Sequence, residues 1–78
     1  MTLAVIVRSR EGVLFEGPAA SVSALNDTGP FDILAKHENF ISIIRQKIII
    51  RSNAMREFLL NAGVIKVRGN RVEIYIGF

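Results

Sequence analysis

A rhythm of short β-branched runs separated by turn-forming residues constrains the fold of this chain most strongly. Segments rich in valine and isoleucine are interrupted by pairs such as Gly17-Pro18, Gly29-Pro30 and Gly69-Asn70. Strands of about five residues with turns every 8–12 residues are typical of antiparallel sandwiches and barrels. Consecutive isoleucines lose χ1 freedom in a helix and pack well on a pleated surface, so strands are expected even in the Ile-rich region 40–50. The sequence therefore predicts an all-β fold without helices.

The predicted strands are residues 3–8, 13–16, 19–25, 31–34, 40–45, 47–51, 55–60, 64–67 and 71–76. Gly17-Pro18 should end the second strand. Because proline has no N–H to give to a ladder, Pro18 is expected at a strand boundary or at a sheet edge. Asn61-Ala62-Gly63 is predicted to be a bulge or bend, and Gly69-Asn70 a two-residue hairpin turn. Alternation groups side chains onto shared faces: Leu3, Val5 and Val7; Val22 and Ala24; Phe31 and Ile33, facing inward; and Val72, Ile74 and Ile76.

Length and composition limit the kinds of protein that this chain can be. Its 78 residues suffice for one domain, residues 1–78, and half of them are hydrophobic, which excludes a disordered chain. There is no cysteine and a single histidine, so we expect no disulfide and no metal site. No apolar run approaches the roughly 18 residues of a membrane span, and no signal peptide is evident, so the expected compartment is the cytoplasm. The net charge of +3 comes from scattered basic residues, which favours a solvated surface over a nucleic-acid site.

The sequence contains no arrangement of residues that predicts catalysis. His37 could act as a general base, but neighbouring residues on an extended chain point to opposite sides, and this separates it from Glu38. The serines lack a Gly-x-Ser-x-Gly elbow, and the glycines form no phosphate-binding loop. Most phenylalanines lie at core-facing positions, which leaves Tyr75 and Phe78 as the aromatic residues able to stack on bases. We expect no catalytic residues, no cofactor and no nucleic-acid partner; the alternative is a stand-alone β-sandwich module that binds protein or RNA.

The stretch from Gly29 to Phe40 is where a function is most expected. It contains the only histidine and lies between two apolar runs, after the turn signal Asn26-Asp27-Thr28. Loops of small β domains carry contacts while their strands carry packing. The Ile-rich region that follows is apolar on both faces, as expected for a strand covered on both sides within a sandwich or by a partner subunit.

Several segments, in register over nearly the whole chain, resemble one family. The segment from Val7 to Gly17 resembles the opening of the ε subunit of bacterial F-type ATP synthases, called δ in mitochondria. Gly-Pro-Phe-Asp-Ile-Leu-Ala-Lys-His, ending at His37, is similar to that family's Gly-x-Phe-Gly-Ile-Leu-Pro-Gly-His. Leu-Asn-Ala-Gly-Val-Ile-Lys-Val, ending at Val67, resembles its Ser-Gly-Gly-x-Leu-Glu-Val, and Asn70-Arg71-Val72 matches its Asn-x-Val.

The resemblance implies a two-sheet antiparallel β-sandwich and a non-catalytic subunit of the central stalk, or rotor. Such a subunit docks on the γ subunit and on the c-ring, couples proton transport to ATP synthesis, and meets the membrane only through the complex, peripherally at its cytoplasmic face in bacteria. The resemblance places two loops at the end that faces the c-ring, with the residues Asp27, Thr28, Gly29, Pro30, Asp32, Lys36, His37 and Glu38. The expected γ contacts are Phe40, Ile41, Ile43 and Ile49.

The chain also departs from the family pattern. The family's Pro-Gly before the histidine is Ala35-Lys36 here, and its Pro-Gly turn after the next strand is Arg45-Gln46-Lys47. The family often has an acid just before the phenylalanine, where this chain has Pro30. Asp27, Asp32 or Glu38 is therefore expected to replace that acid in pairing with basic loops of the c-ring. Because the sequence ends at Phe78, we expect no C-terminal helical hairpin, and with it neither the inhibition of hydrolysis nor the nucleotide sensing of that segment.

Overall fold

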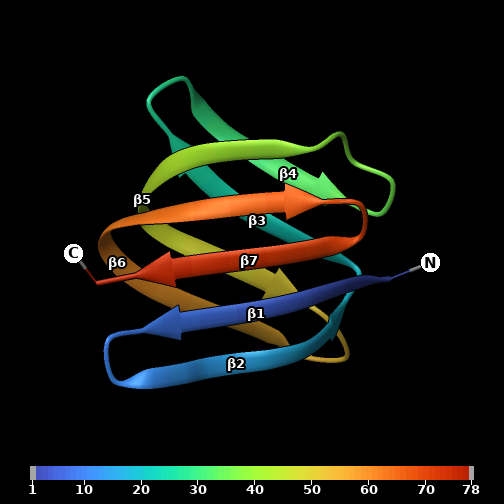
Figure 1. Ribbon diagram of the computed structural model, residues 1–78, viewed down its shortest axis with the longest axis horizontal. Helices are drawn as coiled ribbons and strands as arrows, with labels where there is room; N and C mark the ends of the chain where they lie inside the picture. The colour runs from blue at the N-terminus through green and yellow to red at the C-terminus, as the bar shows by residue number, and fades with distance from the viewer. Residues whose placement is uncertain (1, 78) are drawn as a thin grey trace.

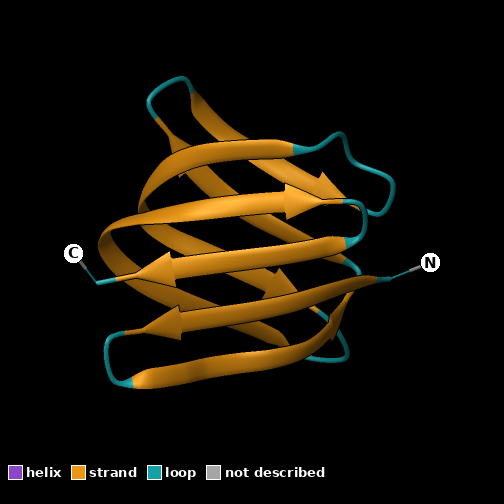
Figure 2. Cartoon of the chain, in the orientation of Figure 1, coloured by secondary structure: helices purple, strands orange, loops and turns teal. Residues whose placement is uncertain are grey.

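The computed structural model describes residues 2–77. This part of the chain contains seven β-strands joined by turns and short loops, and no helix (Figures 1 and 2). The strands are β1 (Leu3–Ser9), β2 (Gly12–Ala19), β3 (Ser21–Asn26), β4 (Gly29–Leu34), β5 (Phe40–Arg51), β6 (Met55–Arg68) and β7 (Arg71–Ile76). They form one sheet in the order β2-β1-β7-β6-β5-β3-β4. All neighbours are antiparallel except β1 and β7, which are parallel. The predicted all-β fold is confirmed.

Two long strands fold this sheet into two layers. β5 has 12 residues and β6 has 14. The first half of β5 pairs with the second half of β6, and the second half of β5 with the first half of β6. The front layer therefore comprises β2, β1, β7, the second half of β6 and the first half of β5. The back layer comprises the first half of β6, the second half of β5, β3 and β4. Figure 1 shows β5 and β6 sweeping from one layer into the other.

The bend lies at a β-bulge, as the Asn61-Ala62-Gly63 pattern predicts. Between the pairs Ile44↔Gly63 and Gln46↔Leu60, β6 supplies two residues where β5 supplies one, and Gln46 has a φ of 72°. A bulge increases twist and bends a strand without ending it. The prediction of separate strands on either side of the bend was therefore wrong. Gly63 is needed there, because an added Cβ would collide with the carbonyl oxygen of Tyr75 on β7.

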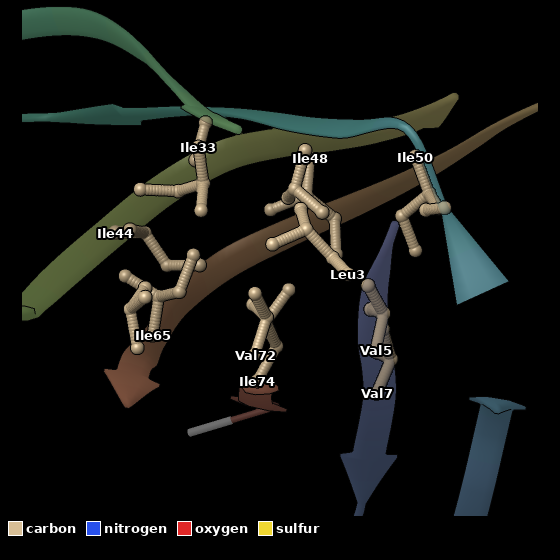
Figure 3. Close-up of a cluster of buried hydrophobic side chains, with 14 residues drawn as sticks. Leu3, Val5, Val7, Ile33, Ile44, Ile48, Ile50, Ile65, Val72 and Ile74 are labelled. Carbon is tan, nitrogen blue, oxygen red and sulfur yellow. The ribbon is translucent and has the colours of Figure 1, made fainter. Parts of the chain in front are cut away.

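The core lies between the two layers and is built from aliphatic side chains (Figure 3). Its buried members are Leu3, Val5, Val7, Ala19, Val22, Ala24, Ile33, Ile44, Ile48, Ile50, Ile65, Val67, Val72 and Ile74. Six partly buried side chains pack at its margin: Phe15, Phe31, Phe40, Phe58, Leu60 and Ile76. The faces predicted from alternation are those observed. Full burial of one such aliphatic side chain stabilises the fold by about 1.5–3 kcal/mol.

The two prolines lie in the two edge strands of the sheet. β2 continues through Gly17 and Pro18 to Ala19, and β4 begins at Gly29 and includes Pro30. The edge position predicted for Pro18 is observed, but the predictions that Gly17-Pro18 ends its strand and that Gly29-Pro30 belongs to a loop were wrong. An edge strand needs ladder hydrogen bonds on one side only and tolerates a residue without an N–H. Proline also removes a donor from an exposed edge, which discourages pairing with another chain.

Candidate partner-binding surfaces

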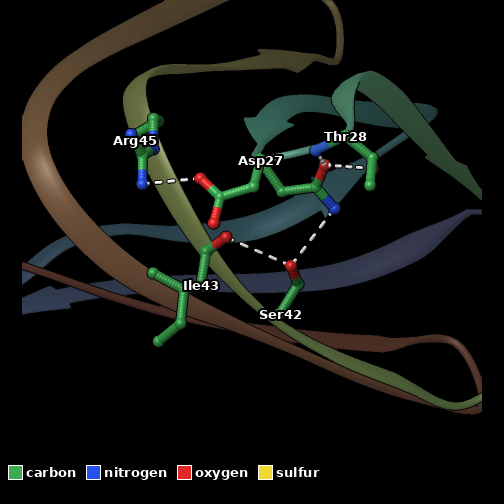
Figure 4. A network of polar contacts seen from close by, with 6 residues as sticks. Asp27, Thr28, Ser42, Ile43 and Arg45 are labelled. Atoms are coloured by element: carbon green, nitrogen blue, oxygen red, sulfur yellow. Dashed lines mark hydrogen bonds and ion pairs between the residues drawn. The ribbon is translucent and has the colours of Figure 1, made fainter.

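The β3–β4 turn is tied to the first half of β5 by side chains (Figure 4). The Oδ1 atom of Asn26 accepts hydrogen bonds from the Thr28 N–H at 2.9 Å and from the Thr28 hydroxyl at 2.6 Å. The amide nitrogen of Asn26 donates to the Ser42 hydroxyl at 3.2 Å. An Asn side chain that bonds the backbone two residues on stabilises a tight turn. The turn therefore has a defined position against β5.

Asp27 and Asp32, two acids predicted to contact the c-ring, already have partners within the chain. Asp27 Oδ1 lies 2.6 Å from Arg45 Nη2, and both side chains are exposed. Asp32 accepts a hydrogen bond from the Ser23 hydroxyl at 2.5 Å, and the Arg51 guanidinium donates to the same hydroxyl oxygen. An exposed ion pair contributes roughly 0–1 kcal/mol, so a binding partner could displace it at little cost.

The loop that contains His37 is anchored to the β6–β7 turn. The Lys36 N–H donates to Asn70 Oδ1 at 2.8 Å, and the Gly69 N–H donates to Asn39 Oδ1 at 3.0 Å. Between these two contacts Lys36 has a φ of 68°, which is unusual for a residue with a side chain. His37 Nδ1 donates to the Glu38 carbonyl at 2.7 Å, a contact within the loop itself.

The structure does not bring the two predicted c-ring loops together. Asn26 pairs with Gly29 at one end of the β3–β4 hairpin, and Ser21 pairs with Leu34 at the other. At about 3.3 Å per residue, the loops before and after β4 are separated by roughly 17 Å. Asp27, Thr28, Gly29 and Pro30 lie at the turn end, on the upper left in Figure 1, and Lys36, His37 and Glu38 at the opposite end. The expectation of a shared end overlooked that the loops flanking a single strand lie at its two ends.

The four predicted γ contacts also lie on different faces. Ile41 and Ile43 are 68% and 57% exposed on the outer face of the front layer. Phe40 faces the other way and packs edge-on against Phe31, with ring centroids 5.4 Å apart. Ile49 lies beyond the bulge and is opposite Ser23 and Glu57 in the back layer. Alternation along β5 and the change of layer at the bulge separate these residues.

Cross-strand pairing extends the Ile43 surface across the front layer. Ile43 is opposite Val64, Val64 is opposite Tyr75, and Tyr75 is opposite Arg8. Tyr75 is 46% exposed, and Arg8 both donates to its hydroxyl at 3.0 Å and lies 5.8 Å from its ring centroid. We call Ile41, Ile43, Val64 and Tyr75 the apolar stripe. Alternation had placed Tyr75 away from the core, but only the strand order shows that it joins Ile43. Phe78, the other predicted exposed aromatic, lies outside the described residues.

Residues 2–77 offer no group of three or more metal-ligating side chains that could hold a metal ion. Within the same residues no helix is long and apolar enough to cross a membrane.

Comparison with known proteins identifies the family. The family model for the ATP synthase delta/epsilon chain beta-sandwich domain matches residues 2–76. The chain belongs to this family. It is 31% identical over 67 residues to the ATP synthase epsilon chain of Clostridium novyi, and 28% identical over 68 residues to that of Sulfurimonas denitrificans. These alignments cover 82% and 83% of this chain but 51% and 52% of the relatives, so the chain spans about half the length of the curated relatives it matches.

Solved structures share the fold of this chain. A chain of the Euglena gracilis mitochondrial ATP synthase, in a structure of OSCP/F1/c-ring, matches with a TM-score of 0.88 at 14% identity, over 96% of this chain and 50% of that one. A chain of the Tetrahymena thermophila mitochondrial ATP synthase, in a central stalk/c-ring structure, matches with a TM-score of 0.84 at 17% identity, over 100% and 65%. At these identities the likeness establishes the fold.

Proposed function

We propose that this chain is a non-catalytic central-stalk subunit of a proton-translocating F-type ATP synthase. In this role it docks on the γ subunit and the c-ring, and couples proton transport to ATP synthesis. The observation that carries the proposal is the match of residues 2–76 to a family of ATP synthase subunits. The subunit would be peripheral to the membrane and held there, at the cytoplasmic face in a bacterium, by the rest of the complex.

The apolar stripe is the proposed γ contact. Ile41, Ile43 and Tyr75 are large side chains left exposed on one face, whereas most other isoleucines of the chain are buried in the core. Apolar area gains roughly 25 cal/mol for each Å² removed from water, so covering this face would favour association. Contiguous exposed apolar residues of this kind commonly mark protein contacts. Phe40 and Ile49, which lie elsewhere, are not part of this contact.

The β3–β4 turn is the proposed c-ring contact. It projects at one end of the sandwich and carries Asp27, whose exposed pairing with Arg45 can be exchanged for a cation of another subunit. The turn is also joined to the strand that carries Ile43 through the Asn26–Ser42 hydrogen bond. One rigid unit would therefore contact γ with its face and the ring with its end. The His37 loop, at the opposite end, lies outside this ring contact.

Affinity capture from a co-expressed complex tests this function. The chain is co-expressed with γ and the c-ring of the same source, and γ and c retained with the tagged chain are quantified. We expect both to be retained, and Ile41→Asp combined with Ile43→Asp to reduce γ retention at least tenfold. Leu59→Asp is the matched control, because Leu59 is 75% exposed in the back layer. Absence of γ with the unmodified chain would contradict the proposal.

A further inference from the structure

A cluster of cations lies beside the apolar stripe on the same face of the front layer. Lys66, Arg68, Arg71 and Glu73 line a shallow, open notch of about 240 Å³ on β6 and β7. Lys66 is directly opposite Glu73, and Arg68 is directly opposite Arg71 across the hairpin. Three cations therefore share one carboxylate, and the notch has a surplus of two positive charges.

The pairing within this cluster leaves cations free for another molecule. Glu73 contacts Arg71 at 3.7 Å, while Arg68 forms no ion pair within the described part of the chain. Like charges directly opposite each other in an antiparallel pair destabilise it. The Arg68–Arg71 pair is therefore unfavourable for the isolated domain, and a carboxylate supplied from outside would relieve the repulsion. Arginine suits this role because its planar fork matches carboxylate oxygens in a bidentate arrangement.

The notch and the apolar stripe are close enough to contact a single partner. Arg68 follows Val64 by four residues on β6, and four residues of strand span about 13 Å. A typical stable interface covers about 800 Å² of each partner, or close to 28 Å on a side. Both features therefore fit within one interface, with the stripe at its centre and the cations toward one edge.

We propose that Lys66, Arg68 and Arg71 form a carboxylate-binding element that accepts acidic side chains of the γ subunit beside the apolar stripe. This inference rests on the proposed function, because it takes γ as the partner. Charged groups at the edge of an interface act mainly on the association rate and on specificity, and they depend on ionic strength. The partner surface should accordingly present apolar residues bordered on one side by aspartate or glutamate.

The test compares two double variants that remove the same charge from opposite faces. Arg68→Gln with Arg71→Gln neutralises the notch, and Lys47→Gln with Arg51→Gln neutralises two cations of the back layer, on strand β5. Binding of each variant to purified γ is followed by surface plasmon resonance from about 50 mM to about 500 mM NaCl, and folding of each is checked by thermal unfolding. Screening lengths shrink from roughly 14 Å to roughly 4 Å over this range.

The notch variant should associate about tenfold more slowly than the unmodified chain at low salt, and within about twofold of it at high salt. The back-layer variant should stay within about twofold at every salt concentration. Equal behaviour of the two variants, with the unmodified chain binding γ, would overturn the carboxylate-binding element alone. If the unmodified chain does not bind γ, the proposed function and this inference both fall.

Discussion

Replacing Gly63 by alanine should destabilise the domain more than the same substitution at any other glycine with ordinary backbone angles. Gly63 lies at the bend where β6 changes layers, and its Cα is opposite that of Ile76. An added Cβ would collide with the Tyr75 carbonyl oxygen, lie 2.9 Å from Leu60 Cδ1 and lie 3.3 Å from Ile76 Cγ2. The leucine can rotate, but the carbonyl belongs to the backbone of β7, so the two strands must separate.

The expected loss follows from this forced separation. Inserting a methyl group into a packed site usually costs about 1–3 kcal/mol, and a collision with backbone places this variant near the upper value. With a shift of about 4–8 °C per kcal/mol for a domain of this size, a loss of about 3 kcal/mol lowers Tm by roughly 12–24 °C. Because small domains are stable by about 5–15 kcal/mol, the variant should remain folded at low temperature.

Urea and thermal unfolding, followed by circular dichroism, provide the measurement. Gly17→Ala is the matched control: Gly17 also lies in a strand, but the nearest atom to its added Cβ is Phe15 Cζ at 3.8 Å. Gly17→Ala should be neutral or stabilising by up to about 1 kcal/mol, because alanine restricts the unfolded chain. A Gly63→Ala variant within about 0.5 kcal/mol of the unmodified chain would refute the close approach of β6 and β7 at this bulge.

Three further outcomes are expected. Lys36→Gly with Gln46→Gly should raise Tm by a few degrees, because relief of about 1–2 kcal/mol of left-handed strain per site outweighs the roughly 0.5–1 kcal/mol of added unfolded-state entropy; a lower Tm would contradict this. Asn70→Ala should accelerate hydrogen exchange at the Lys36 amide, which loses its acceptor, while exchange in the β3–β4 hairpin stays unchanged; equal exchange at Lys36 would argue against the anchor. Asp27→Lys should reduce c-ring retention in capture experiments at low salt while γ retention persists, and equal retention of the ring would exclude this acid from the contact.

The sequence predicted those parts of the fold that depend on neighbouring residues. Leu3, Val5 and Val7 share a buried face because side chains alternate along any strand, whatever its partners. The Gly69-Asn70 turn and the bulge before Val64 follow from local turn chemistry in the same way. The family resemblance read from such segments is confirmed by the match over residues 2–76.

Features that depend on strand order were beyond the reach of local patterns. Ile41 and Phe40 are adjacent in sequence, yet one is exposed and the other packs at the margin of the core, and the choice depends on register. Ile43 on β5 and Tyr75 on β7 belong to one apolar stripe only because β6 lies between these two strands and pairs with both. The two departures from glycine, Lys36 and Gln46, both retain the positive φ that the family's glycines would adopt without strain. The local sequence shows that glycine is replaced at these two positions, but it does not show that the backbone keeps a positive φ.

The parallel pairing of β1 with β7 has a consequence for the order in which the domain can fold. Within residues 2–77, β1 pairs with β2 and β7, and β7 is the last of the seven strands. The β1–β2 hairpin, although synthesised before the other five strands, cannot join the rest of the sheet until β7 has left the ribosome. Closure of the front layer then requires contact between segments more than 60 residues apart, as in the Val5↔Val72 pair, and such long-range contacts slow folding. Until that step, the open edges of β1 and of the second half of β6 are available to other chains, and a nascent chain paused before β7 would be prone to aggregate.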